Sequence, residues 1–192
     1  MHDVLSFNWP KKGNRAFSMA VDRASPALLP CFIFATSGVY AVGFKSAADK
    51  IIEGIDMDRN PDVYFFPVAY LYRHYLELTL KNIVDIGRKA GAITVPQEQL
   101  RTHNLHELWN LARKLIGGVS SEEDMMAIDA IQSVILEFHQ LDERGDAFRY
   151  STDNRGNRHL INAPEWISLA TLKNTMDAVA NFLEAAEAII SV

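Results

Sequence analysis

Charged and aromatic side chains gather in one short segment of the chain, residues 142–150. The segment carries both charge signs beside two aromatic rings, at Asp142, Glu143, Arg144, Asp146, Phe148, Arg149 and Tyr150. A guanidinium can hold a phosphate with two parallel hydrogen bonds, and an aromatic ring can stack on a base. We therefore predict binding residues at Asp142, Arg144, Phe148, Arg149 and Tyr150. The structural alternative is that Arg149 ties the segment to Glu77 or Asp85, and that the rings fill the end of the fold.

A second candidate set, Arg73, His74 and Glu77, lies on one predicted helix. Arg73 and Glu77 are four residues apart, so the guanidinium and the carboxylate can pair on one helix face. A structural ion pair is one interpretation of this spacing. The functional interpretation places Arg73 or His74 in a groove shared with residues 142–149, where the guanidinium would hold a phosphate.

Three histidines, His103, His106 and His159, are candidate catalytic bases. A neutral imidazole at the start of a helix, as predicted for His106, can accept a proton. In an endoribonuclease, one of these histidines would activate a ribose 2′-hydroxyl and Arg149 would stabilise the phosphorane. The structural alternative is that His103 and His106 only cap or pack beside a helix start. They lack a third ligand nearby in sequence, so we expect no metal site.

The composition is typical of one ordinary globular domain. The 192 residues are 48% hydrophobic, and the net charge of −5 argues against a broad surface for duplex DNA. A single cysteine, Cys31, excludes an internal disulfide framework and fits a cytoplasmic location. The sequence has no P-loop, dinucleotide-binding glycine pattern, nucleophile elbow or HExxH motif, so we expect no cofactor.

The uncharged stretch 24–44 is long enough to raise the question of a membrane span. Pro26, Pro30 and several polar residues interrupt it, and positive residues flank it on both sides. A buried core helix over residues 31–55 is therefore the better interpretation, and we expect no contact with a membrane.

Hydrophobic periodicity predicts further helices over residues 61–87, 105–116, 121–143 and 164–190. Residues 1–25 are interpreted as an N-terminal arm with a short helix. The turn-forming residues 153–157 predict a short β-hairpin or an irregular segment near residues 145–163. The expected fold is an all-α, up-and-down bundle of four to five helices that forms one domain over residues 1–192.

Three strings in this order resemble a group of small HEPN-like (higher eukaryotes and prokaryotes nucleotide-binding) proteins. They are YLYRHYLELTLKNI at residues 70–83, THNLHELW at 102–109 and DERGDAFRYSTDNRG at 142–156. The resemblance spans roughly residues 61–190 and implies a homodimeric helical bundle. It also implies binding of RNA, a nucleotide or a partner protein, in phage defence or a toxin–antitoxin setting.

The sequence departs from the ribonucleases of that family at their catalytic motif, an Arg separated from a His by four to six residues. Arg144 and Arg149 have no His at that interval, and only three residues separate Arg155 from His159. Arg101 and His106 match the spacing, but they lie at the start of a helix and are interpreted as a chance match. The chain thus resembles a divergent member, for which a metal-independent endoribonuclease and a non-catalytic helical scaffold are the alternatives to a binding protein.

Overall fold

The computed structural model describes residues 12–13, 37–55, 61–160 and 163–191. The chain divides into two units, Met1–Ile33 and Phe34–Val192, and the helical bundle belongs to the second. Its described residues form helices α1 (Ser37–Gly54), α2 (Asp62–Lys89), α3 (Leu105–Val119), α4 (Met125–Leu141) and α5 (Leu169–Ile190), with a 3-10 turn, η1 (Gln97–Arg101). The predicted all-α bundle is confirmed. Apart from residues 12–13, the N-terminal arm expected over residues 1–25 lies outside the described residues, as does the predicted helix start at residue 31.

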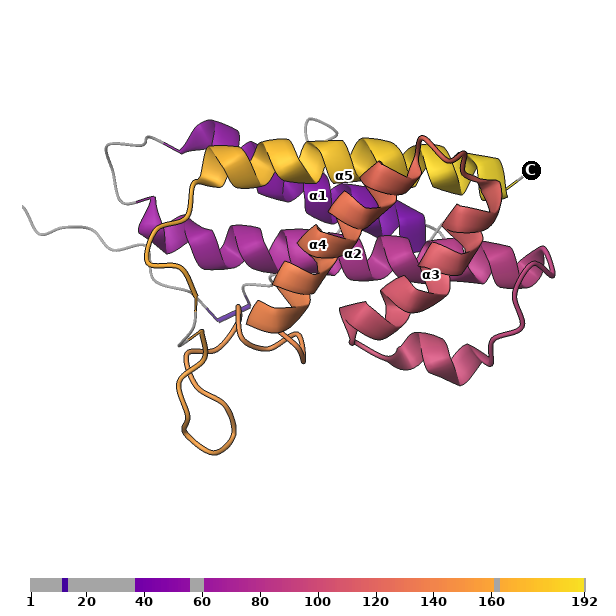
Figure 1. The fold of residues 1–192 in the computed structure, drawn as a ribbon. Helices are drawn as coiled ribbons and strands as arrows, with labels where there is room; N and C mark the ends of the chain where they lie inside the picture. Colours follow the sequence, from indigo (N-terminus) through magenta and orange to yellow (C-terminus); the bar gives the residue numbers. More distant parts are fainter. Residues whose placement is uncertain (1–11, 14–36, 56–60, 161–162, 192) are drawn as a thin grey trace, which may run out of the picture. The chain divides into compact units, whose positions relative to one another are not determined.

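The long helix α2 is the central helix of the bundle. It packs against α1, α3 and α5, and α3 in turn packs against α4. Figure 1 shows α1 and α5 running alongside α2, with α4 crossing the bundle. Because the apolar residues of α2 recur at intervals of three and four, one face, with Val68, Leu76, Leu80 and Ile83, is completely buried. Within the described part of the chain, no helix has the length and apolar character needed to cross a membrane.

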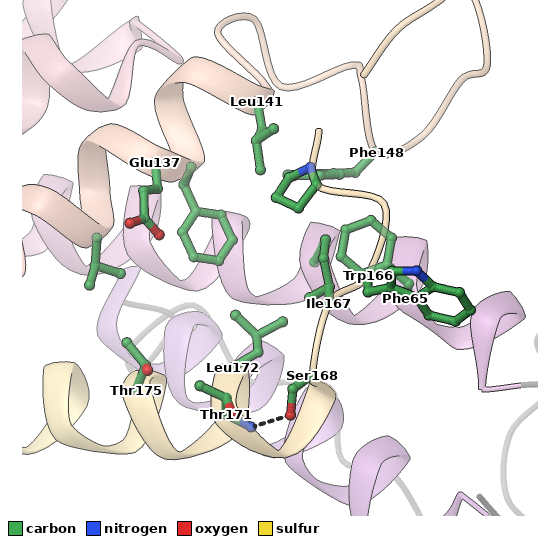
Figure 2. Close-up of a pocket in the computed structure, with 14 residues that line it drawn as sticks. Phe65, Glu137, Leu141, Phe148, Trp166, Ile167, Ser168, Thr171, Leu172 and Thr175 are labelled. Atoms are coloured by element: carbon green, nitrogen blue, oxygen red, sulfur yellow. Dashed lines mark hydrogen bonds between the residues drawn. The ribbon is translucent and has the colours of Figure 1, made fainter. Parts of the chain in front are cut away.

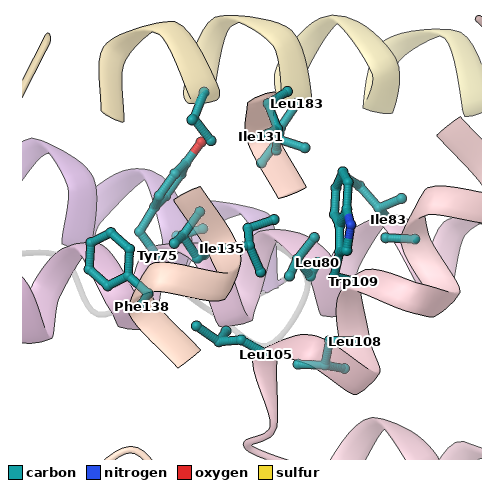
Figure 3. Close-up of a cluster of buried hydrophobic side chains, with 14 of the residues drawn as sticks. Tyr75, Leu80, Ile83, Leu105, Leu108, Trp109, Ile131, Ile135, Phe138 and Leu183 are labelled. Carbon is teal, nitrogen blue, oxygen red and sulfur yellow. The ribbon is translucent and has the colours of Figure 1, made fainter. Parts of the chain in front are cut away.

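The core is centred on the large side chains that α2, α3, α4 and α5 turn toward one another (Figure 3). Trp109 of α3 is fully buried and packs in this cluster beside Leu80 and Ile83. Its indole Nε1 donates a hydrogen bond of 3.0 Å to the side-chain oxygen of Gln132 on α4. The one polar atom of this ring is therefore satisfied, and the bond also joins α3 to α4.

Two helix starts illustrate how the caps set the boundaries. Asn104 caps α3, because its side-chain oxygen accepts the backbone N–H of Glu107 at 3.0 Å. The predicted start of the last helix at Pro164 is wrong, since α5 begins at Leu169. The hydroxyl of Ser168 accepts the backbone N–H of Thr171 at 3.1 Å and supplies the cap there. Residues 163–168 are therefore an irregular strap before α5.

The segment after α4 is irregular, which was the second of the two predicted alternatives. Its described residues contain only an isolated antiparallel bridge between Thr152 and Arg158. The carboxylate of Asp153 accepts the backbone N–H groups of Arg155 and Asn157, each at 2.8 Å. Such side-chain bonds satisfy the backbone locally and compete with a strand ladder, which explains why no hairpin strands form there.

Candidate functional site

Arg73 of α2 is buried and binds three separate parts of the fold. Its Nη1 lies 3.1 Å from a carboxylate oxygen of Glu77 on the same helix. Its Nη2 donates to the carbonyl oxygen of His103 at 2.8 Å, and its Nε donates to the carbonyl oxygen of Asp142 at 3.0 Å. We call these four residues the Arg73 network. The predicted pairing of Arg73 with Glu77 is present, and it lies inside the protein.

Glu77 is buried as well, and its second carboxylate oxygen, Oε1, faces two further groups. The ammonium of Lys81 donates to it at 2.7 Å, and Nδ1 of His103 lies 2.8 Å from it. Burial by itself pushes the pKa of Glu77 up, but Lys81 and His103 outweigh burial and hold the pKa below its ordinary value. Glu77 is therefore a charged member of the network near neutral pH.

Asp142 ends α4 and fixes the loop that follows. Its Oδ1 accepts the backbone N–H groups of Asp146 and Ala147 at 2.8 and 2.9 Å. Its Oδ2 lies 3.2 Å from Nε of Arg73, but the angle there is not that of a hydrogen bond. Gly145 has a φ of +80°, and a Cβ placed on it would lie 3.1 Å from Nη1 of Arg73. The loop thus folds tightly over the buried guanidinium.

The turn formed by residues 146–150 separates the side chains of Phe148, Arg149 and Tyr150. Phe148 points inward and packs edge-on against Phe65 and Phe138, with ring centroids 6.1 and 6.4 Å apart. Arg149 and Tyr150 are exposed. Phe148 therefore has the packing role that was the alternative for it, while its two neighbours face solvent.

Arg149 lies between two tyrosine rings. Its guanidinium carbon is 5.8 Å from the centroid of Tyr70 and 5.3 Å from that of Tyr150. Its Nε donates to the carbonyl oxygen of Gly145 at 2.8 Å, which orients the group, and its other two nitrogens make no hydrogen bond to the residues that the structure describes. Tyr70 was not singled out as a site residue from the sequence, although it opens the first of the three strings.

His74 continues this stack along α2. Its ring lies parallel to that of Tyr70, with centroids 5.8 Å apart, and edge-on to Phe44 of α1 at 4.4 Å. Burial lowers the pKa of His74 below its ordinary value of 6.5. We call Tyr70, His74, Arg149 and Tyr150 the Arg149 cluster.

Residues of the same loop also line a polar cavity of about 470 Å³. Arg144, Arg155 and His159 line it together with the carboxylates of Glu143, Asp146 and Asp153. Within the described part of the chain, no salt bridge engages Arg144 or Arg155. The cavity therefore offers guanidinium groups for an anion and carboxylates for hydroxyl or amine groups.

Among the described residues, no hydrogen bond joins the candidate catalytic residues to one another. The rings of His106 and His139 are 5.9 Å apart, and both His103 and His106 are exposed. His159 lines the polar cavity. In the described part of the chain, no three His, Cys, Asp or Glu side chains gather in the way that a metal ion requires.

The chain matches no family model, and no curated protein or solved structure matches it either. What this site does must therefore follow from its own geometry.

Proposed function

We propose that this chain is a HEPN-like helical protein that binds RNA through the Arg149 cluster and the polar cavity. The observation that carries the proposal is the exposed guanidinium of Arg149 between two tyrosine rings, at 5.8 and 5.3 Å. A planar guanidinium with two nitrogens that no described residue engages fits a phosphate, and an exposed tyrosine offers a stacking surface for a base. The resemblance to HEPN-like proteins supports the same function and a setting in phage defence or a toxin–antitoxin pair.

The polar cavity offers two further arginines from the same segment of the chain. Arg144 and Arg155 line it, so three guanidinium groups fall within a stretch of twelve residues. Carboxylates line the same cavity, which favours a ligand with both phosphate and hydroxyl groups, as a ribose–phosphate chain has. Three phosphate contacts on a single strand predict a slope of about −2 for the logarithm of affinity against the logarithm of salt concentration.

The direct test is a fluorescence anisotropy titration of the protein against labelled single-stranded RNA oligomers. We expect Arg149→Ala and Tyr150→Ala each to weaken binding about tenfold, as lost phosphate and stacking contacts do. Arg149→Lys should also weaken it, because an ammonium keeps the charge but loses the planar stacking. Lys114→Ala, which removes an exposed positive charge from α3, is the matched control and should bind like the wild type.

Two results would overturn the proposal. One is a wild-type protein that binds no RNA, which would leave a partner protein or a scaffold role for the bundle. The other is an equal loss of affinity in Lys114→Ala and Arg149→Ala, which would reduce the binding to unspecific attraction by charge.

A second candidate function, metal-independent RNA cleavage, is favoured by one contact. Nδ1 of His103 lies 2.8 Å from the buried carboxylate of Glu77. A carboxylate that accepts a hydrogen bond from Nδ1–H orients an imidazole and leaves Nε2 as the proton acceptor, which is what a general base needs. The test is incubation of labelled RNA with the protein in the presence of a chelator. Cleavage should be lost in His103→Ala and kept in His106→Ala, and this candidate is rejected if the wild type leaves the RNA intact.

A further inference from the structure

Two pockets outside the proposed RNA-binding surface adjoin α2, and they differ in polarity. An apolar groove of about 330 Å³ between α2, α4 and the start of α5 is lined mainly by aromatic and aliphatic side chains, including those of the strap before α5 (Figure 2). The other pocket, of about 250 Å³, lies between α1, α2 and the end of α5, and the carboxylates of Glu184 and Glu187 line it. We call it the carboxylate pocket, and its chemistry indicates a ligand.

The two carboxylates of this pocket have no cation among the described residues. Glu184 and Glu187 are three residues apart on α5, so they share one face of the helix. No described lysine, arginine or histidine lines the pocket, and no salt bridge of the described residues engages either carboxylate. Burial and the charge of Glu184 raise the pKa of Glu187, although Asn82 donates to its Oε1 at 2.7 Å. The pocket therefore holds negative charge that the described residues do not balance.

The place of these carboxylates at the end of α5 adds to the negative charge. Both lie within the last two turns of the helix, and its last turn contains no basic residue. The carbonyl end of a helix carries about half a negative charge and favours cations, so acidic side chains there are unfavourable for folding. A bound cation would offset the carboxylates and the helix end together.

A buried hydroxyl adds a third acceptor to the pocket. Tyr75 of α2 lines it and is 2% exposed, and its hydroxyl makes no hydrogen bond with the residues that the structure describes. Thr79 lies near this hydroxyl, but the two groups do not have the geometry of a hydrogen bond. The hydroxyl points toward α5 (Figure 3), and burial together with the charges of Glu184 and Glu187 raises the pKa of Tyr75. A buried hydroxyl without a partner is destabilising, so a ligand that donates to it would satisfy it.

These groups select the chemistry of the ligand. A primary ammonium group carries one positive charge and three N–H donors, which two carboxylates and one hydroxyl can accept. The rest of the wall is apolar and suits a short aliphatic chain, since it includes Ala41, Val42 and Ala188. We propose that the carboxylate pocket binds a small aliphatic primary amine, with its ammonium group between Glu184, Glu187 and Tyr75.

The volume of the pocket limits the size of this amine. A cavity of about 150 Å³ already holds a benzene molecule. The carboxylate pocket, at about 250 Å³, therefore has room for n-butylamine. The inference does not depend on RNA binding, because the carboxylate pocket shares no lining residue with the polar cavity and contains no member of the Arg149 cluster.

The test is isothermal titration calorimetry of the full chain with n-butylamine at neutral pH, where the amine is charged. We expect a Kd of roughly 1 mM, since a ligand this small makes few contacts. Two further probes separate the charge from the N–H donors. The neutral n-butanol has the same chain without the charge, and tetramethylammonium has the charge without an N–H donor. Both should bind at least about tenfold more weakly.

Two substitutions test the residues of the pocket. Glu187→Gln removes one charge at nearly constant size and should weaken the binding of n-butylamine about tenfold. Tyr75→Phe removes only the hydroxyl and should weaken the binding about fivefold. The Tm of Tyr75→Phe should equal or exceed that of the wild type, because the unpaired hydroxyl is gone, whereas a structural role of the hydroxyl would lower it. Glu123→Gln is the matched control, since Glu123 is exposed and does not line the pocket.

Three results would overturn the proposal. The first is a wild type that shows no saturable binding of n-butylamine, and the second is equal affinity for n-butylamine and n-butanol. The third is an equal loss of affinity in Glu123→Gln and Glu187→Gln. Circular dichroism of each variant before the titration ensures that the affinities are those of folded protein.

Discussion

At the residue scale, Gly145 is the position where the site leaves least room. Its left-handed φ is shared with Gly156, and both belong to the irregular segment after α4. They differ in surroundings, because a Cβ on Gly145 would meet the guanidinium of Arg73, whereas a Cβ on Gly156 would have open space. A comparison of alanine variants at the two glycines therefore separates the free-energy cost of backbone strain from the cost of crowding the Arg73 network.

We expect Gly145→Ala to lower the free energy of unfolding by at least about 1 kcal/mol more than Gly156→Ala does. Both variants carry the strain of a side chain in the left-handed region, about 1 kcal/mol. Only Gly145→Ala also displaces Arg73. Urea denaturation of the two variants measures the difference, and equal midpoints would show that the contact does not constrain the loop.

The residue scale also shows what the sequence could predict about the site. The spacing of Arg73 and Glu77 predicts their pairing, because residues four apart share a helix face. It does not predict that Arg73 donates to the carbonyl groups of His103 and Asp142, since any residue type has a carbonyl group and those positions are distant in the chain. The contact of Tyr70 with Arg149 could not be predicted either, because the two residues are far apart in the sequence.

At the element scale, the Arg73 network connects α2 to the start of α3 and the end of α4. We expect Arg73→Met to lower the free energy of unfolding by about 3 kcal/mol or more, because it leaves the buried carboxylate of Asp142 without its cation and removes one of the two cations that contact Glu77. Lys89→Met is the control on the same helix. Lys89 pairs with Asp85 at the surface, so this change should cost less than about 1 kcal/mol.

Urea denaturation again provides the measurement. A loss below about 1 kcal/mol for Arg73→Met would mean that packing alone holds the three elements together.

The helices themselves were largely predictable, and the strap before α5 was not. Periodic apolar residues locate α2, α3 and α4 because each helix buries one face. Residues 164–168 carry Pro164, a typical first-turn residue, and also Ser168, a typical cap, so two helix starts were compatible with the sequence. The packing of the strap against the groove decides in favour of Ser168, and that packing depends on α2 and α4.

At the scale of the whole molecule, burial of histidine makes stability depend on pH. Burial lowers the pKa of both His74 and His139 below 6.5. The unfolded chain then takes up these protons before the folded protein does. The stabilising contribution of each neutral imidazole is therefore complete above about pH 6.5 and is lost as the pH falls through the lowered pKa.

We expect the free energy of unfolding to fall as the pH is lowered from about 7.5 to about 5. His74→Phe keeps an aromatic ring beside Tyr70 and Phe44 but cannot take up a proton, so the fall should be shallower in that variant. Lys114→Ala, at an exposed position, is the control and should follow the wild type. Parallel curves for the wild type and His74→Phe would assign the pH dependence to other groups.

The two main-chain contacts of Arg73 have an evolutionary consequence. A carbonyl oxygen is present whatever side chain a codon specifies, so a mutation at position 103 leaves the bond from Nη2 in place. As far as this bond is concerned, position 103 is therefore open to genetic drift, whereas positions 73, 77, 142 and 145 are not. If divergent homologues of this chain nevertheless retain a histidine at 103, selection must be acting on its imidazole, which contacts the buried carboxylate of Glu77.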